Sequence, residues 1–216
     1  MAANAITLRA DAARNRQSIL CAAGAVFAAE GTGVTLEHIA RVAGVGVGTI
    51  YRRFPSIDRL IEVVFEEKMS LYADRTEAAA EQALTEPWPA FRDYVLYIAE
   101  QQANDLAFSD LILSPQRGTE LFRVQMRRAL KASLTLVDRA KSSGAIRPDF
   151  EHSDLYLLTH ANAGLVRGTR TSAPDSWRRL AQYLLQSFRH PAADDDELIA
   201  PSPTLSRAQR LARRIE

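Results

Sequence analysis

Apolar residues recur at helical spacing along nearly the whole of this 216-residue chain. Between Ile19 and Phe27 they follow the i, i+3, i+4, i+7 rule of an amphipathic helix, and the same pattern returns from Trp177 to Phe188. No comparable stretch alternates with the period of two that a half-buried strand shows. The sequence therefore predicts an all-α fold of about nine helices.

Capping and breaking residues delimit these helices. Gly31 ends the first, Thr35 and Ser56 are N-cap types, and Gly44 and Pro55 interrupt the pattern. A first helix that reaches residue 30 is predicted, and another begins at Pro87. The remaining helices span roughly 35–43, 47–54, 56–82, 108–113, 118–142, 153–168 and 174–188.

Four segments follow from this pattern. We predict an N-terminal arm (1–12), a small helical domain (13–56), a larger helical domain (57–189) and a flexible tail (190–216). The tail contains HPAADDDELIAPSPT, with three prolines and an acidic run, and then SRAQRLARRIE. The last stretch fits either a disordered end or a basic helix that contacts DNA or the body of the protein.

Composition excludes several classes of protein. Lys and Arg number 27 and Asp and Glu 26, which excludes attachment to nucleic acid by bulk positive charge but allows a local basic patch. The single cysteine, Cys21, forms no internal disulfide, suits a reducing compartment, and is expected to be a buried small residue. No apolar run is long enough to span a membrane and no secretory signal is recognisable, so we expect a cytoplasmic protein.

The most informative segment is TLEHIARVAGVGVGTIYRRF, residues 35–54. It predicts two short helices around a tight turn at 43–45, with Ile39 and Ile50 holding the pair together. Small residues at Ala40 and Gly44 allow the helices to cross closely. This is the construction of a helix-turn-helix, in which the second helix enters the DNA major groove.

The predicted second helix offers what such a groove requires. Val47 and Gly48 are small enough for close approach, while Thr49, Tyr51 and the arginines supply donors for phosphates. Residues 1–56 hold six basic and three acidic side chains, so this end of the chain is the more positive one.

From about residue 13 to residue 72 the sequence resembles the tetracycline-repressor (TetR) family of bacterial regulators. The resemblance rests on the order of Phe27-Ala28-Ala29-Glu30-Gly31, Thr35, Ile39-Ala40, Ala43-Gly44-Val45, Gly48-Thr49-Ile50-Tyr51, Phe54-Pro55-Ser56 and Leu60. It implies a DNA-binding domain followed by a helical domain that forms a dimer and holds a ligand pocket. Phosphate contacts would come from Thr35, Thr49, Tyr51 and Arg53, and base contacts from Val47 and Gly48.

Two positions depart from the family pattern. Gly46 stands where serine is common, which removes a side-chain cap from the second helix, and Ile57 stands where lysine is common, which removes one phosphate partner. The loss of one ion pair should weaken DNA binding without abolishing it. The complete predicted DNA-binding set is Thr35, Gly46, Val47, Gly48, Thr49, Tyr51, Arg52, Arg53 and Ser56.

The last two helices are predicted to form a four-helix bundle across a two-fold axis in a homodimer. One monomeric helix-turn-helix reads too few base pairs for useful specificity, which favours a dimer on a palindromic operator. Purely internal packing of the same faces is the alternative. The predicted interface consists of Ala161, Gly164, Leu165, Gly168, Ala181, Leu184, Leu185 and Phe188.

A pocket for an unknown small-molecule effector is predicted among the middle helices. Its candidates are Phe91, Tyr94, Ile98, Phe108, Phe122, Met126, Tyr156, His160 and Asn162, although such a set is also typical of plain core. The four histidines share no ligand spacing, so no metal and no cofactor are expected.

The sequence thus predicts a DNA-binding regulator, most simply a homodimeric repressor that a small molecule releases from its operator. The motifs G-x-S-x-G, H-E-x-x-H and the P-loop are absent, so an enzyme is not expected. The alternative is a helical ligand-binding or partner-binding protein that no longer uses its helix-turn-helix on DNA.

Overall fold

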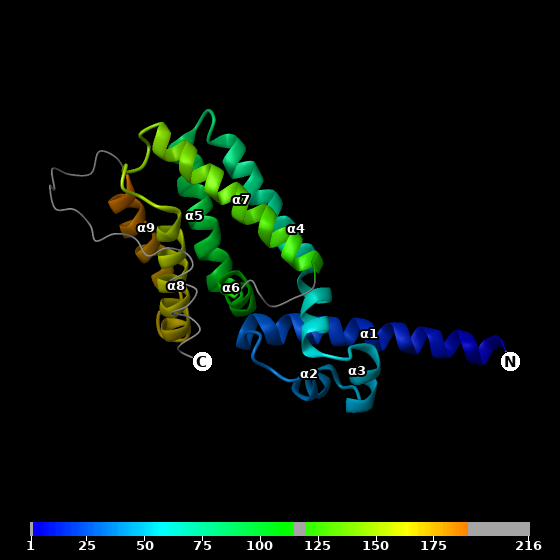
Figure 1. Cartoon of the computed structure of the whole chain (residues 1–216). Coiled ribbons are helices and arrows are strands. Elements are labelled where there is room, and N and C mark those ends of the chain that lie inside the picture. The colour runs from blue at the N-terminus through cyan, green and yellow to red at the C-terminus, as the bar shows by residue number, and fades with distance from the viewer. Residues whose placement is uncertain (1, 115–119, 190–216) are drawn as a thin grey trace. The chain divides into compact units, whose positions relative to one another are not determined.

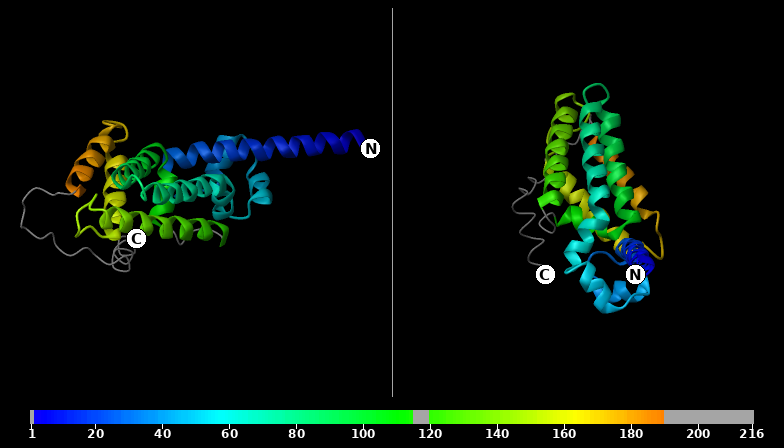
Figure 2. Two further views of the ribbon diagram at one scale, coloured as in Figure 1. Left: turned by 90° about the horizontal axis from the view of Figure 1, so that it is seen from above. Right: turned by 90° about the vertical axis from the view of Figure 1, so that its right-hand side faces the viewer.

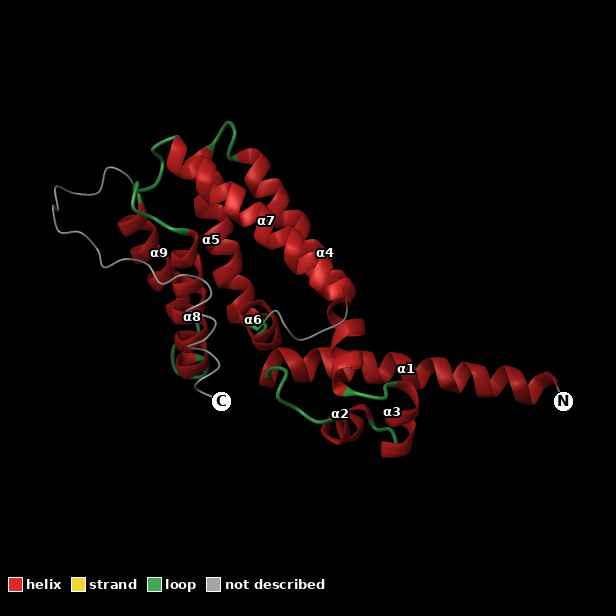
Figure 3. Cartoon of the chain, viewed as in Figure 1, coloured by secondary structure: helices red, strands yellow, loops and turns green. Residues whose placement is uncertain are grey.

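The structure of the protein is a computed structural model that describes residues 2–114 and 120–189. The described residues form helices joined by short loops, with no strand beyond one isolated bridge between Ile146 and Arg189 (Figures 1 and 3). The helices are α1 (Ala2–Glu30), α2 (Leu36–Ala43), α3 (Val47–Arg53), α4 (Ile57–Gln82), α5 (Pro87–Asn104), α6 (Leu106–Leu113), α7 (Glu120–Ser142), α8 (His152–Thr169) and α9 (Ser176–Phe188). The predicted all-α class is confirmed.

Most helix ends lie where the capping residues predicted them. Thr35 accepts a hydrogen bond from the backbone N–H of His38 at 3.2 Å and begins α2, which ends at Gly44 with a left-handed φ of 67°. Asp105 caps α6 in the same way, from the N–H of Phe108 at 3.0 Å. The first helix differs from expectation, because α1 begins at Ala2 and includes the residues predicted as an arm.

The chain divides into two compact units. Among the described residues, the first comprises 2–70, 105–114 and 120–125, and the second comprises 71–104 and 126–189. This division differs from the predicted boundary after residue 56, because the first part of α4 and all of α6 pack with the N-terminal helices. The predicted tail, residues 190–216, lies outside the described residues.

The core of the first unit is built from the inward faces of α1, α2, α3, α4 and α6. Ile19 and Phe27 on α1, Ile39 on α2 and Ile50 on α3 have no exposed surface. The ring of Phe27 lies 5.9 Å from that of Phe65 on α4. Truncation of one such side chain to alanine typically costs about 2–5 kcal/mol, so this apolar contact holds the short helices α2 and α3 in place.

Polar contacts attach α6 to the same unit. The backbone N–H and the hydroxyl of Thr32 both donate to Oδ2 of Asp110, at 2.8 and 3.1 Å. Lys68 on α4 forms an ion pair with Asp105 at 2.7 Å and lies 5.3 Å from the ring centre of Phe108. These contacts connect α6 to two segments of the first unit that lie more than thirty residues away in the sequence.

The second unit packs α5, α8, α9 and parts of α4 and α7 together (Figure 2). The ring centres of Phe91 and Phe150 lie 5.4 Å apart, and those of Phe150 and Phe188 lie 4.9 Å apart, both in edge-to-face geometry. On the surface of this unit, Arg128 on α7 bonds to Asp74 and Glu77 on α4 at 2.7 and 2.6 Å.

Buried polar groups join α5 to α8. The Gln102 amide donates to the Thr159 carbonyl oxygen at 3.0 Å, and the Asn162 amide donates to Gln102 at 2.9 Å and to the Ala99 carbonyl at 3.2 Å. A paired hydrogen bond in a dry interior is favourable while an orphaned group is costly, so this network fixes how the two helices face each other.

No helix within the described ranges has the length and hydrophobicity needed to cross a bilayer.

Candidate nucleic-acid interface

The turn between α2 and α3 depends on one left-handed glycine. Gly44 takes the φ that favours glycine, and its N–H bonds to carbonyl oxygens of the last turn of α2. The next residue, Val45, donates its N–H to the Ala40 carbonyl oxygen at 3.0 Å. These bonds satisfy the end of α2 within three residues, and α3 begins at Val47. The predicted helix-turn-helix geometry is confirmed.

The outer surface of this motif is partly apolar. Val42, Val47 and Tyr51 are exposed by 51%, 48% and 45%, while Ile50 on the opposite side of α3 is completely buried. A Cβ atom added at Gly48 would meet nothing within 4 Å. The exposed side chains of Val47 and Tyr51 thus lie beside a bare glycine on this short helix.

The first turns of α3 and α4 are capped differently. Gly46 is the N-cap of α3 and provides no side-chain hydrogen bond, as predicted from the missing hydroxyl. The first turn of α3 is closed instead by the Thr49 N–H, which donates to the Gly46 carbonyl oxygen at 2.8 Å. Ser56 accepts from the Arg59 N–H at 3.2 Å at the start of α4.

Tyr51 has a partner that the sequence did not suggest. Its hydroxyl donates to Oε1 of Glu37, on the first turn of α2, at 2.5 Å. This bond is the main reason that the pKa of the Glu37 carboxyl lies below its ordinary value, and it raises the pKa of the Tyr51 phenol. The separation of 14 residues hides the pair in the sequence, since only the crossing of α2 and α3 brings it together.

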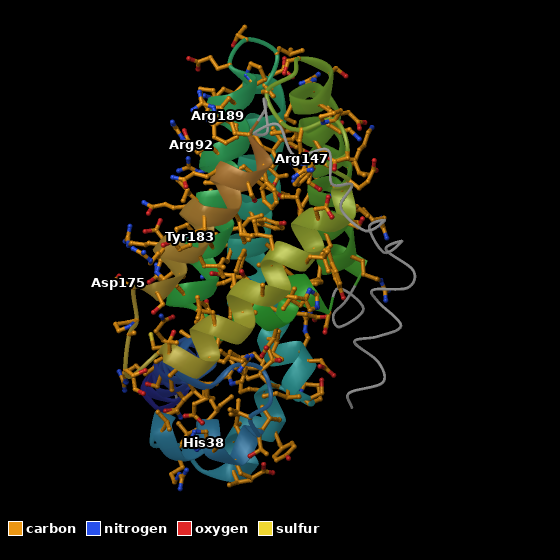
Figure 4. The ribbon with its side chains drawn as sticks, turned by 90° about the vertical axis from the view of Figure 1, so that its left-hand side faces the viewer. His38, Arg92, Arg147, Asp175, Tyr183 and Arg189 are labelled. Carbon is orange, nitrogen blue, oxygen red and sulfur yellow. The ribbon has the colours of Figure 1, made fainter. Side chains whose placement is uncertain are left out.

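His38, labelled in Figure 4, lies on α2 between two charged side chains. Its Nε2 lies 3.0 Å from the Glu30 carboxylate and its Nδ1 lies 2.6 Å from an Arg41 nitrogen. Arg52 and Arg53 are exposed at the end of α3, and Arg52 reaches the Thr49 hydroxyl at 3.4 Å. Of the predicted phosphate donors on α3, Tyr51, Arg52 and Arg53 are exposed and Thr49 is half-buried.

The predicted dimer residues fall into two groups. On α8, Ala161, Gly164 and Gly168 are exposed, and a Cβ atom at either glycine would meet nothing within 4 Å. On α9, Ala181 and Leu185 are only 2% and 6% exposed because they pack inside their own unit. Leu165, Leu184 and Phe188 are half-buried. The exposed residues of the predicted interface therefore lie on α8, whereas two of its α9 residues are buried within the protomer.

The predicted pocket residues are distributed over both compact units. Phe91, Tyr94 and Ile98 are buried along α5, and Asn162 is held in the α5–α8 network. Tyr156 and His160 stack with ring centres 3.9 Å apart. Phe108 and Phe122 belong to the other compact unit, whereas Met126 begins the part of α7 that lies in the second.

A cavity of about 390 Å³ in the second unit lies between α5 and α9. None of the predicted pocket residues lines it. Its lining consists of Asp93, Leu96, Tyr97, Glu100, Trp177, Arg178 and Gln182. Arg178 crosses it, with its guanidinium 4.5 Å from the Trp177 ring centre and 3.8 Å from the Glu100 carboxylate. Figure 4 shows Asp175 and Arg189 toward the two ends of the bordering helix α9.

The prediction that Cys21 is buried is wrong. Its side chain is exposed on α1, and its sulfur accepts a weak hydrogen bond from Gln17 at 3.5 Å. The residue lies off the apolar stripe formed by Ile19, Ala23 and Phe27, so the helical register turns it outward. In the described parts of the chain, no three His, Cys, Asp or Glu side chains gather as metal ligands would.

Comparison with known proteins agrees with this geometry. Residues 19–64 match the sequence profile of the bacterial regulatory proteins of the tetR family. No curated protein matches the chain.

Solved structures match over most of the chain. The fatty acid degradation regulator FadR from Bacillus halodurans is 22% identical, with a TM-score of 0.50 over 81% of this chain and 100% of that one. A mutant of HlyIIR is 17% identical, with a TM-score of 0.56 over 87% and 100%. An ArpA-like gamma-butyrolactone receptor is 18% identical, with a TM-score of 0.53 over 82% and 98%. At these identities the likeness establishes the fold.

Proposed function

We propose that the chain is a homodimeric repressor of the TetR family, whose sequence profile residues 19–64 match, and that a small molecule releases it from a palindromic operator. The observation that carries the proposal is the exposed tip of α3, where apolar side chains and a bare glycine are flanked by hydroxyls and arginines. Inserted in a major groove, this surface pairs base contact at the tip with phosphate contact at its edges.

A dimer is supported by the small exposed residues of α8. Ala161, Gly164 and Gly168 leave the helix backbone open to a close neighbour, and Leu157 beside them is 46% exposed. Two copies packed through this face place two recognition helices on successive grooves, about one helical turn apart. The operator is then a palindrome.

Release by a ligand requires that the ligand prefer a second conformation. Helix α4 has residues in both compact units, with residues 57–70 in the first and 71–82 in the second. We propose that a shift of α4 changes the spacing of the two recognition helices, so that both half-sites are no longer held together. The family is one of regulators, and we propose neither catalysis nor a cofactor for this chain, which would act in the cytoplasm.

The test is selection of bound duplexes from a random pool, followed by affinity measurements on the selected duplex and a scrambled one at two salt concentrations. Enrichment of a palindrome, with binding that weakens as salt rises, is the expected result. Failure to enrich any sequence at low salt would favour the alternative, a helical ligand-binding protein that does not use its helix-turn-helix.

The contact residues are tested by Tyr51→Phe combined with Arg53→Ala. Loss of one ion pair should lower the salt slope by about one unit, and the double variant should bind all duplexes more weakly. Arg178→Ala, on α9, removes the same charge from the second unit and should leave DNA binding unchanged. Equal operator affinity in the double variant and the parent would refute these contacts.

A further inference from the structure

The carboxylate of Glu37 lies among groups that the proposed function assigns to DNA phosphates. The Tyr51 hydroxyl donates to it at 2.5 Å, from the recognition helix to the first turn of α2. This bond is the largest of the causes that lower the pKa of the Glu37 carboxyl. Glu37 is exposed and therefore stays ionised at neutral pH.

An ionised carboxylate on this surface has few acceptable partners in a duplex. It only accepts hydrogen bonds, and phosphate oxygens also only accept, so a phosphate placed here repels it. Most base-edge groups in the major groove are acceptors or the thymine methyl. Only the amino groups of cytosine and adenine donate there.

We propose that Glu37 is a specificity-determining residue, which admits a duplex only where a cytosine or adenine amino group meets its carboxylate. In the free protein Glu37 holds the Tyr51 hydroxyl, and on an unsuitable sequence it leaves an unpaired charge facing DNA. The inference rests on the proposed function. Its consequence is that non-specific DNA binds more weakly than the arginines of α3 alone would allow.

The test is Glu37→Gln, studied in the full chain. Glutamine keeps an oxygen that can accept from Tyr51 but removes the charge. Affinity for a scrambled duplex should rise roughly three- to tenfold at low salt, with a salt slope steeper by about one unit. Affinity for the duplex selected by the parent should stay equal or fall, so the ratio of the two affinities drops about tenfold.

Glu30→Gln is the matched control. Glu30 is an exposed carboxylate of the same unit, paired with His38 at 3.0 Å, and its removal changes the net charge equally without touching Tyr51. A specificity ratio that falls equally in both variants would reduce the effect to bulk charge and overturn the proposal.

Selection from a random pool distinguishes the remaining outcomes. Glu37→Gln should relax a cytosine or adenine preference at one position of each half-site, while the parent retains it. Identical enriched sequences and ratios in the two proteins would refute the role of Glu37 even where the parent binds DNA well. Absence of any DNA binding by the parent would instead refute the proposed function itself. A purely structural role predicts a lower melting temperature with unchanged base preference, which also contradicts the proposal.

Discussion

Protonation of His152 would create a buried N–H group at Nδ1 with no acceptor for its hydrogen. Its Nε2 lies 2.8 Å from the Ser133 hydroxyl oxygen, and that hydroxyl donates to the Leu130 carbonyl at 2.9 Å, so Nε2 carries the proton. The other ring nitrogen, Nδ1, is buried without a hydrogen-bond partner. Burial therefore lowers the pKa of His152 below 6.5, although the charge of Asp138 opposes the shift.

This residue makes stability depend on pH. The unfolded chain takes up a proton on His152 near pH 6.5, whereas the folded chain takes it up only at lower pH, so the free energy of unfolding falls as pH drops below about 6.5. His152→Gln removes the titration. The stability of the parent relative to this variant, measured by urea unfolding, should be greater at pH 8 than at pH 5. A constant difference over that range would contradict the assignment.

Thr35 and Glu37 show what a local sequence signal can and cannot predict about single residues. Thr35 accepts the His38 N–H and so begins α2, while Glu37, two residues later, accepts from the distant Tyr51 hydroxyl. The cap is visible in the sequence because threonine precedes a helical pattern. The bond to Glu37 is invisible there, since nothing in a residue's type says which of several acceptors its hydroxyl reaches.

At the scale of elements, α6 is the helix whose packing departs most from sequence order. It follows α5 along the chain but belongs to the compact unit of α1, α2 and α3. Asp105 and Asp110 explain this, because each carboxylate on this short apolar helix receives a donor from a distant segment. Its apolar run predicted a helix, whereas its polar contacts with Lys68 and Thr32 became visible only in the tertiary structure.

Asp110 should therefore be important for the first unit. Asp110→Ala leaves the nearly buried N–H of Thr32 without this acceptor, which typically costs about 1–3 kcal/mol of unfolding free energy. Asp110→Asn retains one accepting oxygen and should cost less. Hydrogen exchange at the Thr32 amide should speed up in the alanine variant.

Asp93→Ala, at an exposed carboxylate on α5, serves as the control for this series. It should leave both the unfolding free energy and the Thr32 exchange rate close to those of the parent. Asp110→Ala with parental stability and unchanged exchange would show that α6 is held by its apolar contacts alone.

At the scale of the whole molecule, the proposed dimer depends on the bare outer face of α8. Gly164→Glu should leave the protomer folded, because a Cβ atom there meets nothing within 4 Å. Across a two-fold axis the same carboxylates would face each other, so sedimentation should report monomers and operator affinity should fall at least about tenfold.

Leu84→Glu provides the comparison, since Leu84 is 59% exposed in the loop between α4 and α5. It introduces the same charge away from α8 and should leave the sedimentation unchanged. If the Gly164→Glu protein remained dimeric, the dimer interface would not be on this face of α8. If the parent sedimented as a monomer, the proposed dimer would be refuted.

Local signals were sufficient for most of the fold. The spacing of apolar residues, the caps at Thr35 and Ser56 and the left-handed Gly44 define the helices and the helix-turn-helix within the sequence itself, because each acts over a few residues. The predicted surface of α3 followed from the same register. Cys21 was mispredicted because its position on the helix was not considered. It lies off the apolar stripe of α1, so its side chain is exposed.

Tertiary structure alone decided the pairings that join distant segments. The Glu37–Tyr51 bond, the attachment of α6 and the burial of Ala181 and Leu185 each depend on which helices cross and at what rotation. The cavity beside Trp177 likewise exists only because α5 and α9 lie together. Helix periodicity identifies the face that is buried, but not the partner that buries it, because many apolar faces are equally suitable until all of them compete for one core.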